Sequence, residues 1–506
     1  MALPQFILAI DQGTTNTKVV LVDRLGAIRA KASRPLAISF PKPGWVEQDA
    51  KLLWNSVTEA IDECVERAGK AEIIAIGVSN QRESVLAWDR RSGVPLGPCV
   101  VWQCRRTADF CDELRARGLE PLIRRRSGLP VDPLFSASKI RWLLANIPNG
   151  LKRAANGELC VGTVDSWLLW KLSGGSMHAT DASNASRTQL LNLRDGQWDN
   201  DLLEIFEVPA QCLPTIHPSS VFFAHTVALG RLPAGGAVQS LIGDSHAALF
   251  GHGAFDPGAV KATYGTGTSL MTPIVSPIAS ARGLVTTVAW SEPGHICYAL
   301  EGNITNTGGA VQWLADFLTV SGNAGEIGAE QIAELAASVP DTGGVYLVPA
   351  FGGLGAPHWD TRARGVICGL TRGTRAAHVA KATLDSIAYQ VFDVFQALRQ
   401  DATLSEPTLF VDGGASRNSA LMQFQADILA CPVIRASSPD LSAIGAAWLA
   451  GLAVGYWHSL SELRALPRET TRFEPRMPES QRAELLAGWH QALAKSMSPS
   501  SAEVLG

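Results

Sequence analysis

AIDQGTTNTKVVLVD (residues 9–23) contains two apolar runs joined by a short turn of glycine and hydroxyl residues. The first run ends at the carboxylate of Asp11, and Gly13 supplies a residue that tolerates positive φ in a tight turn. This pattern predicts a β-hairpin. A plain hairpin needs no carboxylate, hydroxyl cluster or lysine at its turn, whereas backbone N–H groups, hydroxyls and one cation together make an anion site. The stretch alone leaves both interpretations open.

The size and composition of the chain indicate a multidomain globular protein. A chain of 506 residues exceeds what one core organises, so at least two domains are expected. A net charge of −4 gives no electrostatic reason to expect nucleic acid or an anionic membrane as a partner. Nine scattered cysteines without a C-x-x-C pair indicate reduced thiols in a cytoplasm. No histidine lies among Cys99, Cys104 and Cys111, which favours buried packing over zinc binding.

Three segments of the sequence bear on targeting, membrane insertion and fraying. The N-terminal MALPQFILAI has no basic region, so it does not read as a signal peptide. LSAIGAAWLAGLAVGYW (441–457) is shorter than a membrane span, contains three glycines and lacks flanking Lys or Arg. It therefore predicts a buried helix. The last residues, 496–506, are expected to be frayed.

The opening pattern recurs in the second half of the chain. GAVKATYGTGTSLMTP (258–273) again places a Gly/Thr turn between apolar runs, and two further apolar runs deliver Asp244 and Asp412 to a helical pattern. Such similar halves would face each other across a cleft, where ligands tend to bind. Strands alternating with helices predict an α/β fold. The expected elements are strands at 71–80 and 83–89, helices at 135–147 and 378–400, and a strand entering a glycine-rich loop at 344–357.

The absence of several well-known motifs narrows the classes of reaction that this protein could catalyse. The sequence has no G-x-x-x-x-G-K-[ST], no G-x-G-x-x-G after a strand, no H-E-x-x-H and no G-x-S-x-G. The Gly/Thr turns at 13–18 and 265–268 and the strand-end carboxylates suit phosphoryl transfer, which mostly requires charge neutralisation and positioning. Asp11 could hold Mg²⁺, and Asp244 could accept a proton from an attacking hydroxyl. Asp244 could equally cap the helix that begins near Ser245.

A second polar cluster lies at the junction of two predicted strands. Arg82 and Glu83 are adjacent in SNQRES (79–84), and Trp102 follows in VVWQCRRTAD (100–109). The pair could be an exposed turn and the tryptophan a core residue. Equally, the three could present a cation, a carboxylate and an apolar face to a polyhydroxylated ligand. These residues alone leave the choice open.

The chain resembles the FGGY family of carbohydrate kinases, and within it the glycerol kinases, over nearly its whole length. The resemblance implies an α/β fold of two actin-like (ribonuclease H-like) ATPase domains facing each other across a catalytic cleft, with ATP and Mg²⁺ as cofactors. The N-terminal domain would span residues 1–247 and the C-terminal domain residues 248–506. The matching stretches are DQGTT (11–15), PKPGWVEQD (41–49), NQRES (80–84), VVWQCRRTA (100–108), GTVDSWLLWKL (162–172), TDASNASRT (180–188), YGTGTS (264–269), YALEG (298–302), VPAFGGLGAPHWD (348–360), GVICGLTRGTRAAHVAKATLDS (365–386) and VDGGASRNSALMQFQADIL (411–429).

The resemblance also implies roles for individual residues. Asp244 matches the catalytic base, and Asp11 and Asp244 match the metal-associated carboxylates. Substrate contacts are implied for Arg82, Glu83, Trp102, Leu134, Asp244, Ser245 and Ser269. Nucleotide contacts are implied for Thr14, Thr15, Asn16 and Lys18 in the first turn, for Thr266 and Gly267 in the second, and for Gly308, Gln312, Gly414 and Asn418 on the adenosine side.

Three substrate positions depart from the glycerol kinase pattern. Leu134 stands where Tyr is usual, Ser245 where Gln is usual and Ser269 where a Phe closes the pocket. A lost hydrogen bond or aromatic contact costs about 1 kcal/mol each, so these changes together could weaken kcat/KM for glycerol by ~10²-fold. Two serines would also offer polar groups to extra hydroxyls.

The expected reaction is therefore ATP-dependent phosphorylation of a hydroxyl of a small polyol. The substrate would be glycerol, giving glycerol 3-phosphate, or a C4–C5 polyol or ketose: erythritol, threitol, a pentitol, ribulose or xylulose. The alternative is a non-catalytic actin-like ATP-binding protein, and the presence of a candidate base and a polyol-binding set argues against it. We expect a cytoplasmic homodimer or homotetramer that acts on a small polyol or sugar, without nucleic acid or membrane partners.

Overall fold

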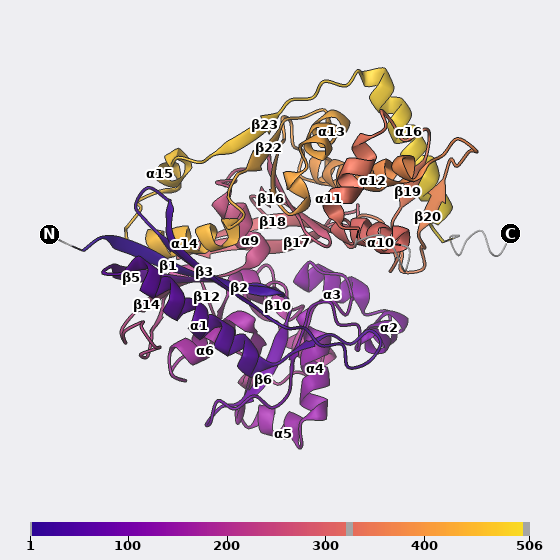
Figure 1. Cartoon of the computed structure of the whole chain (residues 1–506). Coiled ribbons are helices and arrows are strands. Elements are labelled where there is room, and N and C mark those ends of the chain that lie inside the picture. Colours follow the sequence, from indigo (N-terminus) through magenta and orange to yellow (C-terminus); the bar gives the residue numbers. More distant parts are fainter. Residues whose placement is uncertain (1–2, 320–326, 499–506) are drawn as a thin grey trace.

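The computed structural model describes residues 3–319 and 327–498 of the chain. Two mixed β-sheets, one in each half, form the centre of the molecule, with helices packed around them (Figure 1). The residues expected to be frayed lie outside the described part from residue 499 onward.

The opening stretch forms the predicted hairpin. Strand β1 (Gln5–Gln12) pairs antiparallel with β2 (Asn16–Val22), and this register places Asp11 opposite Lys18. The Gly13 N–H closes the turn by donating to the carbonyl of Asn16 at 3.0 Å. Except for the half-buried Phe6, the apolar residues of both strands are buried, which explains why two nearly continuous apolar runs form central strands of this sheet.

The N-terminal sheet has six strands in the order β13-β14-β5-β1-β2-β3. Its strands β1, β5 and β14 are parallel, so their carboxyl ends meet at one edge of the sheet. This edge carries Asp11, Asn80 and Gly243, with Asp244 directly after the last. The other strands of this sheet are β3 (Ile28–Pro35), β5 (Glu72–Asn80), β13 (Ser220–His225) and β14 (Ala237–Gly243).

The C-terminal sheet repeats this topology with one added strand. Its order is β17-β18-β16-β15-β21-β22-β23, and from β18 onward the sequence of parallel and antiparallel pairings equals that from β3 to β13. The two similar halves predicted from the Gly/Thr turns are therefore confirmed. The strands are β15 (Ala259–Tyr264), β16 (Thr268–Ile274), β17 (Val285–Glu292), β18 (His295–Ile304), β21 (Thr408–Gly413), β22 (Val433–Ala436) and β23 (Thr470–Phe473).

The remaining elements agree with the expected α/β alternation. The predicted strands at 71–80 and 83–89 are β5 and β6, the predicted helices are α4 and α12, and the run at 344–357 is the short strand β19 followed by a loop. Smaller strands are β4 (Glu47–Gln48), β6 (Val85–Asp89), β7 (Cys99–Val100), β8 (Leu159–Thr163), β9 (Ala179–Asp181), β10 (Leu191–Asn192), β11 (Gln197–Trp198), β12 (Thr215–His217), β19 (Tyr346–Val348) and β20 (Val366–Cys368). The α-helices are α1 (Ala50–Ala68), α2 (Ala108–Ala116), α3 (Glu120–Ser127), α4 (Ser136–Asn146), α5 (Gly150–Ala155), α6 (Val164–Leu172), α7 (Ala182–Ala185), α8 (Asn200–Ile205), α9 (Asp244–Gly251), α10 (Gly308–Leu318), α11 (Ala329–Ala337), α12 (Ala376–Asp401), α13 (Ser419–Leu429), α14 (Leu441–Ala453), α15 (Leu460–Ala465) and α16 (Glu479–Ser496).

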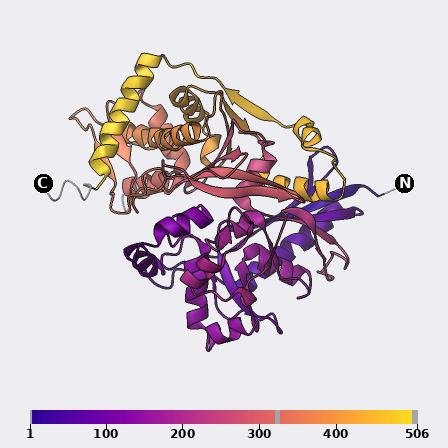
Figure 2. The ribbon, with the colours of Figure 1, turned by 180° about the vertical axis from the view of Figure 1, so that it is seen from behind.

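Helices α9 and α14 join the two halves. They occupy equivalent places in the repeat, after β14 and β22, and they pack directly on each other. A Cβ at Gly445 would lie 1.9 Å from the carbonyl oxygen of Ala247, so only glycine permits this approach. Helix α14 also packs on β1, β5 and β14 of the N-terminal sheet, as the two opposite views show (Figures 1 and 2). The buried helix expected within 441–457 is confirmed.

Within residues 3–319 and 327–498, no helix is long and apolar enough to cross a membrane. All nine cysteines are free, and Cys99, Cys104 and Cys111 are fully buried, which confirms their packing in the core.

Candidate active site

The carboxyl ends of β1, β5 and β14 bring Asp11 and Asp244 to the same sheet edge. Asp11 is buried, and the Ser79 hydroxyl donates to its Oδ1 at 3.0 Å from the neighbouring strand. Burial raises the pKa of Asp11, and the ammonium of Lys18 opposes this. A buried, oriented carboxylate thus lies beside the first Gly/Thr turn.

Arg82 and Glu83 follow β5 at this edge, and both are buried, with 8% and 4% of their surface exposed. The alternative that they form an exposed turn pair is therefore wrong. Glu83 adopts a φ of +59°, in the left-handed region that costs a non-glycine residue about 1–2 kcal/mol. This strained backbone allows two consecutive side chains to enter the same site.

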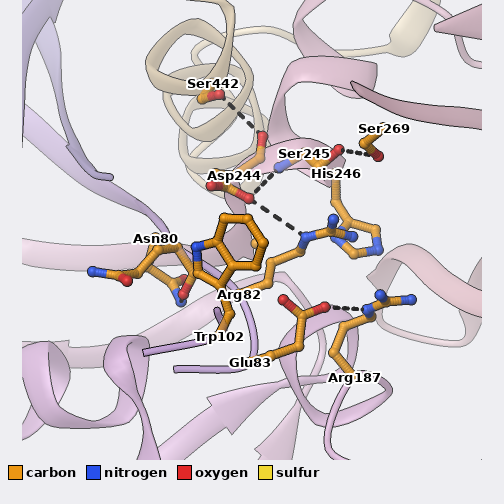
Figure 3. Close-up of polar contacts among 12 residues, drawn as sticks. Asn80, Arg82, Glu83, Trp102, Arg187, Asp244, Ser245, His246, Ser269 and Ser442 are labelled. Carbon is orange, nitrogen blue, oxygen red and sulfur yellow. Dashed lines mark hydrogen bonds and ion pairs between the residues drawn. The ribbon is translucent and has the colours of Figure 1, made fainter. Parts of the chain in front are cut away.

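Four charged side chains form a buried network between the two halves. Glu301, on β18 of the C-terminal sheet, forms ion pairs with both arginines: its Oε1 lies 2.8 Å from Arg82 Nη2, and its Oε2 lies 2.6 Å from Arg187 Nη1. Arg187 Nε also contacts Glu83 Oε1 at 2.6 Å (Figure 3). Burial alone would raise the pKa of Glu301, but the charges of Arg187 and Arg82 outweigh it and hold the pKa well below its usual value. The network fixes Arg82 and Glu83 in place.

Asp244 is the first residue of α9, and Gly243 occupies the N-cap position without a side-chain cap. The alternative that Asp244 is the helix cap is therefore wrong. Its Oδ1 lies 3.5 Å from Arg82 Nε, and 37% of its side chain remains exposed (Figure 3). Burial raises the pKa of Asp244 to about 6; Arg82 opposes the shift, whereas Asp11 and Glu83 add to it. The carboxylate is accessible and more basic than an ordinary aspartate.

Trp102 connects this cluster to the first turn. Its indole N–H donates to Thr14 Oγ1 at 3.0 Å, and its backbone N–H donates to the Ser84 hydroxyl at 3.0 Å. The ring is half-buried. The contact ties a predicted polyol-binding residue to a predicted phosphate-binding residue, although 88 positions separate them in the sequence.

The other residues of the first turn are partly engaged with the protein. Asn16 accepts the Ser33 hydroxyl at 2.9 Å, and Thr15 is exposed. Lys18 lies 3.3 Å from Asp440, the residue before α14 in the C-terminal half. A lysine predicted to bind phosphate therefore contacts a carboxylate of the other half in this structure.

The second turn and the start of α10 form one compact unit. The N–H of Gly308 donates to the carbonyl of Gly265 at 3.1 Å, and that of Gly309 donates to Thr266 at 3.0 Å. A Cβ at Gly267 would lie 2.4 Å from the Ile304 carbonyl, and one at Gly308 would lie 2.6 Å from that of Gly265. Only glycine therefore fits at both positions.

The adenosine-side residues are placed as follows. Gly414 follows β21 and is exposed, with open space where a side chain would lie. Asn418 caps α13 by accepting the N–H of Leu421 at 3.1 Å. Gln312 is exposed on α10 and donates to Asp316 at 2.8 Å. Since β21 is parallel to β15, Gly414 lies at the same sheet edge as the second turn.

The three positions that depart from the family pattern differ in their surroundings. Leu134 is half-buried and packs with Phe135, Val285 and Trp359, an apolar cluster that crosses between the halves. Ser245 and Ser269 are half-buried, and their hydroxyl oxygens lie 3.0 Å apart. The first serine comes from α9 and the second from β16, so this contact also joins the two halves (Figure 3).

Sequence reasoning missed three charged residues of this site. Glu301, Arg187 and Lys261 were not singled out, although each is fully buried. The available signal was a charged residue inside an apolar strand, as in AVKATY (259–264) and YALEG (298–302). A buried charge is rarely found without a partner.

Asp11 and Asp244 are the acidic side chains of the described site that we consider for metal binding. In the part of the chain that the structure describes, no group of three or more His, Cys, Asp or Glu residues could hold an ion. Mg²⁺ in phosphoryl-transfer sites is commonly held by one or two carboxylates together with phosphate oxygens and waters. Asp11, oriented by Ser79, and the accessible Asp244 supply the carboxylate oxygens that would suit Mg²⁺.

Comparisons with known proteins agree with this geometry. Residues 6–251 match the model of the FGGY family of carbohydrate kinases, N-terminal domain, and residues 260–454 match that of the C-terminal domain. A glycerol kinase of Burkholderia ambifaria is 48% identical over 495 residues, with 97% of each chain covered. An apulose kinase of Pectobacterium atrosepticum is also 48% identical, over 492 residues, covering 97% of this chain and 98% of its own.

A solved structure supports the same fold. The crystal structure of Plasmodium falciparum glycerol kinase with ADP superposes with a TM-score of 0.90 at 31% identity, covering 98% of this chain and 99% of that one. The two-domain α/β architecture expected from the sequence is therefore confirmed.

Proposed function

The chain belongs to the FGGY family of carbohydrate kinases and is therefore an ATP-dependent phosphotransferase, and we propose that it phosphorylates one hydroxyl of a small polyol or sugar. The substrate is glycerol, giving glycerol 3-phosphate, or a C4–C5 polyol or ketose. The observation that carries this proposal is the accessible Asp244 carboxylate beside Arg82, with its pKa raised to about 6. Residues 1–247 would carry the polyol site and the base, and residues 248–506 the adenosine site.

Asp244 acts as the general base in this proposal. An attacking hydroxyl must lose its proton as the phosphoryl group is transferred, and a carboxylate with a pKa of about 6 is a better acceptor than an ordinary aspartate. Arg82, held by Glu301, keeps the carboxylate oriented without a short contact, since its Nε is 3.5 Å from Asp244 Oδ1.

The adjacent residues bind the polyol. Arg82 Nη1 is buried without a hydrogen-bond partner among the described residues, so this arginine retains a donor for a substrate hydroxyl if the site rearranges on binding. Arg187 contacts Glu83 through Oε1, which leaves Oε2 to accept from a second hydroxyl. Trp102, oriented by Thr14, supplies an apolar face for the carbon chain.

The two turns bind the phosphates of ATP. Thr14, Thr15, Asn16 and Lys18 lie at the first turn, and Thr266 and Gly267 at the second. Asp11 and Asp244 would hold Mg²⁺, which when bound neutralises charge on the transferred phosphates. Gly308, Gln312, Gly414 and Asn418 would lie on the nucleoside side.

The identity of the substrate is tested by ADP release with MgATP. The panel contains glycerol, erythritol, threitol, the pentitols, ribulose and xylulose, compared as kcat/KM. A relative named glycerol kinase and one named apulose kinase are both 48% identical to this chain, so sequence similarity alone does not identify the substrate. We expect a four- or five-carbon substrate to exceed glycerol by about tenfold, because two of the three changed positions carry small polar side chains. A panel led by glycerol would show that these changes are tolerated. ATP turnover independent of any added polyol would contradict the kinase proposal.

The rate should also depend on pH through Asp244. The base acts only when deprotonated, and its pKa is raised, so activity is expected at neutral pH and lost as the pH falls through about 6. Below that value kcat/KM should fall tenfold per pH unit. The measurement is a pH–rate profile with saturating ATP from about pH 4.5 to about pH 8, a range that brackets the raised pKa of Asp244. An acidic limb centred near 4, the value of an ordinary aspartate, would show that another group controls the rate.

A further inference from the structure

Ser245 and Ser269 belong to a continuous hydrogen-bonded chain between two buried charges. Lys261 Nζ donates to Ser245 Oγ at 2.6 Å, the two serine oxygens lie 3.0 Å apart, and Ser269 Oγ donates to Glu301 Oε1 at 2.9 Å. Glu301 Oε1 in turn accepts Arg82 Nη2 at 2.8 Å. This series of contacts therefore extends from the ammonium group of Lys261 to Arg82, which faces Asp244.

The two charges at its ends determine where each hydroxyl proton points. An ammonium only donates and an ionised carboxylate only accepts. Ser269 must therefore give its one proton to Glu301 and accept from Ser245, and Ser245 must give its proton to Ser269 and accept from Lys261. Each hydroxyl has used its single donor, and each retains one free lone pair. Both serines are half-buried, whereas Lys261 and Glu301 are fully buried, so only the serines can face a ligand.

We propose that Ser245 and Ser269 form an acceptor-only subsite, which makes them specificity-determining residues for a substrate with a hydroxyl group beyond the two nearest the reacting end. The proposal rests on the kinase function above and narrows its substrate class. The favoured class is a polyol or ketose of four or more carbons with a hydroxymethyl group at this position. A methyl group there makes no hydrogen bond, and a carboxylate or carbonyl places a third acceptor against two existing ones.

The test compares three four-carbon compounds that differ only at the terminal carbon. Erythritol carries a hydroxymethyl group, the erythro isomer of butane-1,2,3-triol carries a methyl group, and erythronate carries a carboxylate. One net hydrogen bond corresponds to about a fivefold difference, so kcat/KM for erythritol should exceed that for the triol by at least this factor. Erythronate should be the poorest of the three. Equal values for erythritol and the triol, or preference for erythronate, would overturn the proposal.

Variants identify the residues responsible. In a Ser245→Ala, Ser269→Ala double variant the ratio of erythritol to triol should fall to about one, mainly through KM, because a contact made equally in the ground and transition states affects binding. Ser240→Ala is the matched control, since this buried serine donates to Ala446 across the same two halves but away from the site. A ratio that persists in the double variant would assign the contact elsewhere and contradict the proposal. If the double variant does not fold, the erythronate and triol comparison on the unmodified chain still decides it.

Measurements of ligand binding distinguish a failure of the subsite proposal from a failure of the proposed kinase function. Ligands that bind the folded state raise Tm, so the shift produced by each compound without nucleotide ranks the subsite directly. Absence of ADP release with every compound, together with the expected order of Tm shifts, would refute the kinase activity and support the subsite. ADP release with equal kcat/KM values for erythritol and the triol would support the kinase activity and refute the subsite.

Discussion

Asp244→Asn is expected to reduce kcat by about 10²–10⁴-fold, the usual contribution of a positioned general base. Asparagine keeps the shape of the side chain, but it neither accepts the proton of the attacking hydroxyl nor carries the charge that attracts Arg82. Because Arg82 also contacts Glu301 at 2.8 Å, its position should persist in the variant. The measurement is single-turnover ADP formation with the best substrate of the panel.

Two controls test whether the loss of activity is specific to the role of Asp244 as a base. Asp195→Asn removes an exposed carboxylate away from the site and should leave kcat unchanged. Calorimetric titration with ATP in the absence of Mg²⁺ should give similar affinities for Asp244→Asn and the unmodified chain, because without the metal Asp244 has no proposed role in nucleotide binding. A decrease in kcat of less than about tenfold would assign the base to another group.

Glu301→Gln is expected to lower the free energy of unfolding by about 3–5 kcal/mol, the cost of removing one partner from a buried ion pair. The buried network contains the guanidinium groups of Arg82 and Arg187 and the carboxylates of Glu83 and Glu301, so its own charges balance. Glutamine leaves two buried guanidinium groups facing a neutral amide. The difference is measured by urea denaturation of both proteins.

The control for Glu301→Gln is a surface ion pair. Arg472 and Glu474 are both more than half exposed, so Glu474→Gln should leave the urea midpoint within error. Glu301→Gln should also raise KM for the polyol, since Arg82 loses the partner that fixes it. A variant as stable as the unmodified chain would show that the two arginines do not depend on the Glu301 charge.

Several parts of the site could be predicted because they are local in sequence. The hairpin, the glycine at its turn and the strand-end positions of Asp11 and Asp244 follow from short patterns, since strand periodicity and turn chemistry act over a few residues. Arg82 and Glu83 were also identified as a polar pair, but their burial was not decided by the sequence. The N-terminus of α9 could not be predicted in the same way. A carboxylate at the start of a helical pattern is typical of an N-cap, and only the structure shows that Gly243 occupies the N-cap position.

The sequence by itself determined the two halves, the strand and helix order and the candidate residues, because each depends on periodicity or on contiguous motifs. Only the tertiary structure brought Glu301 of β18 to Arg82 and Arg187, and Lys261 to Ser245. These contacts join residues far apart in the chain, and they form where two separate sheets meet. Charge pairing and hydrogen-bond direction at that junction depend on distances between the halves, which no local pattern contains.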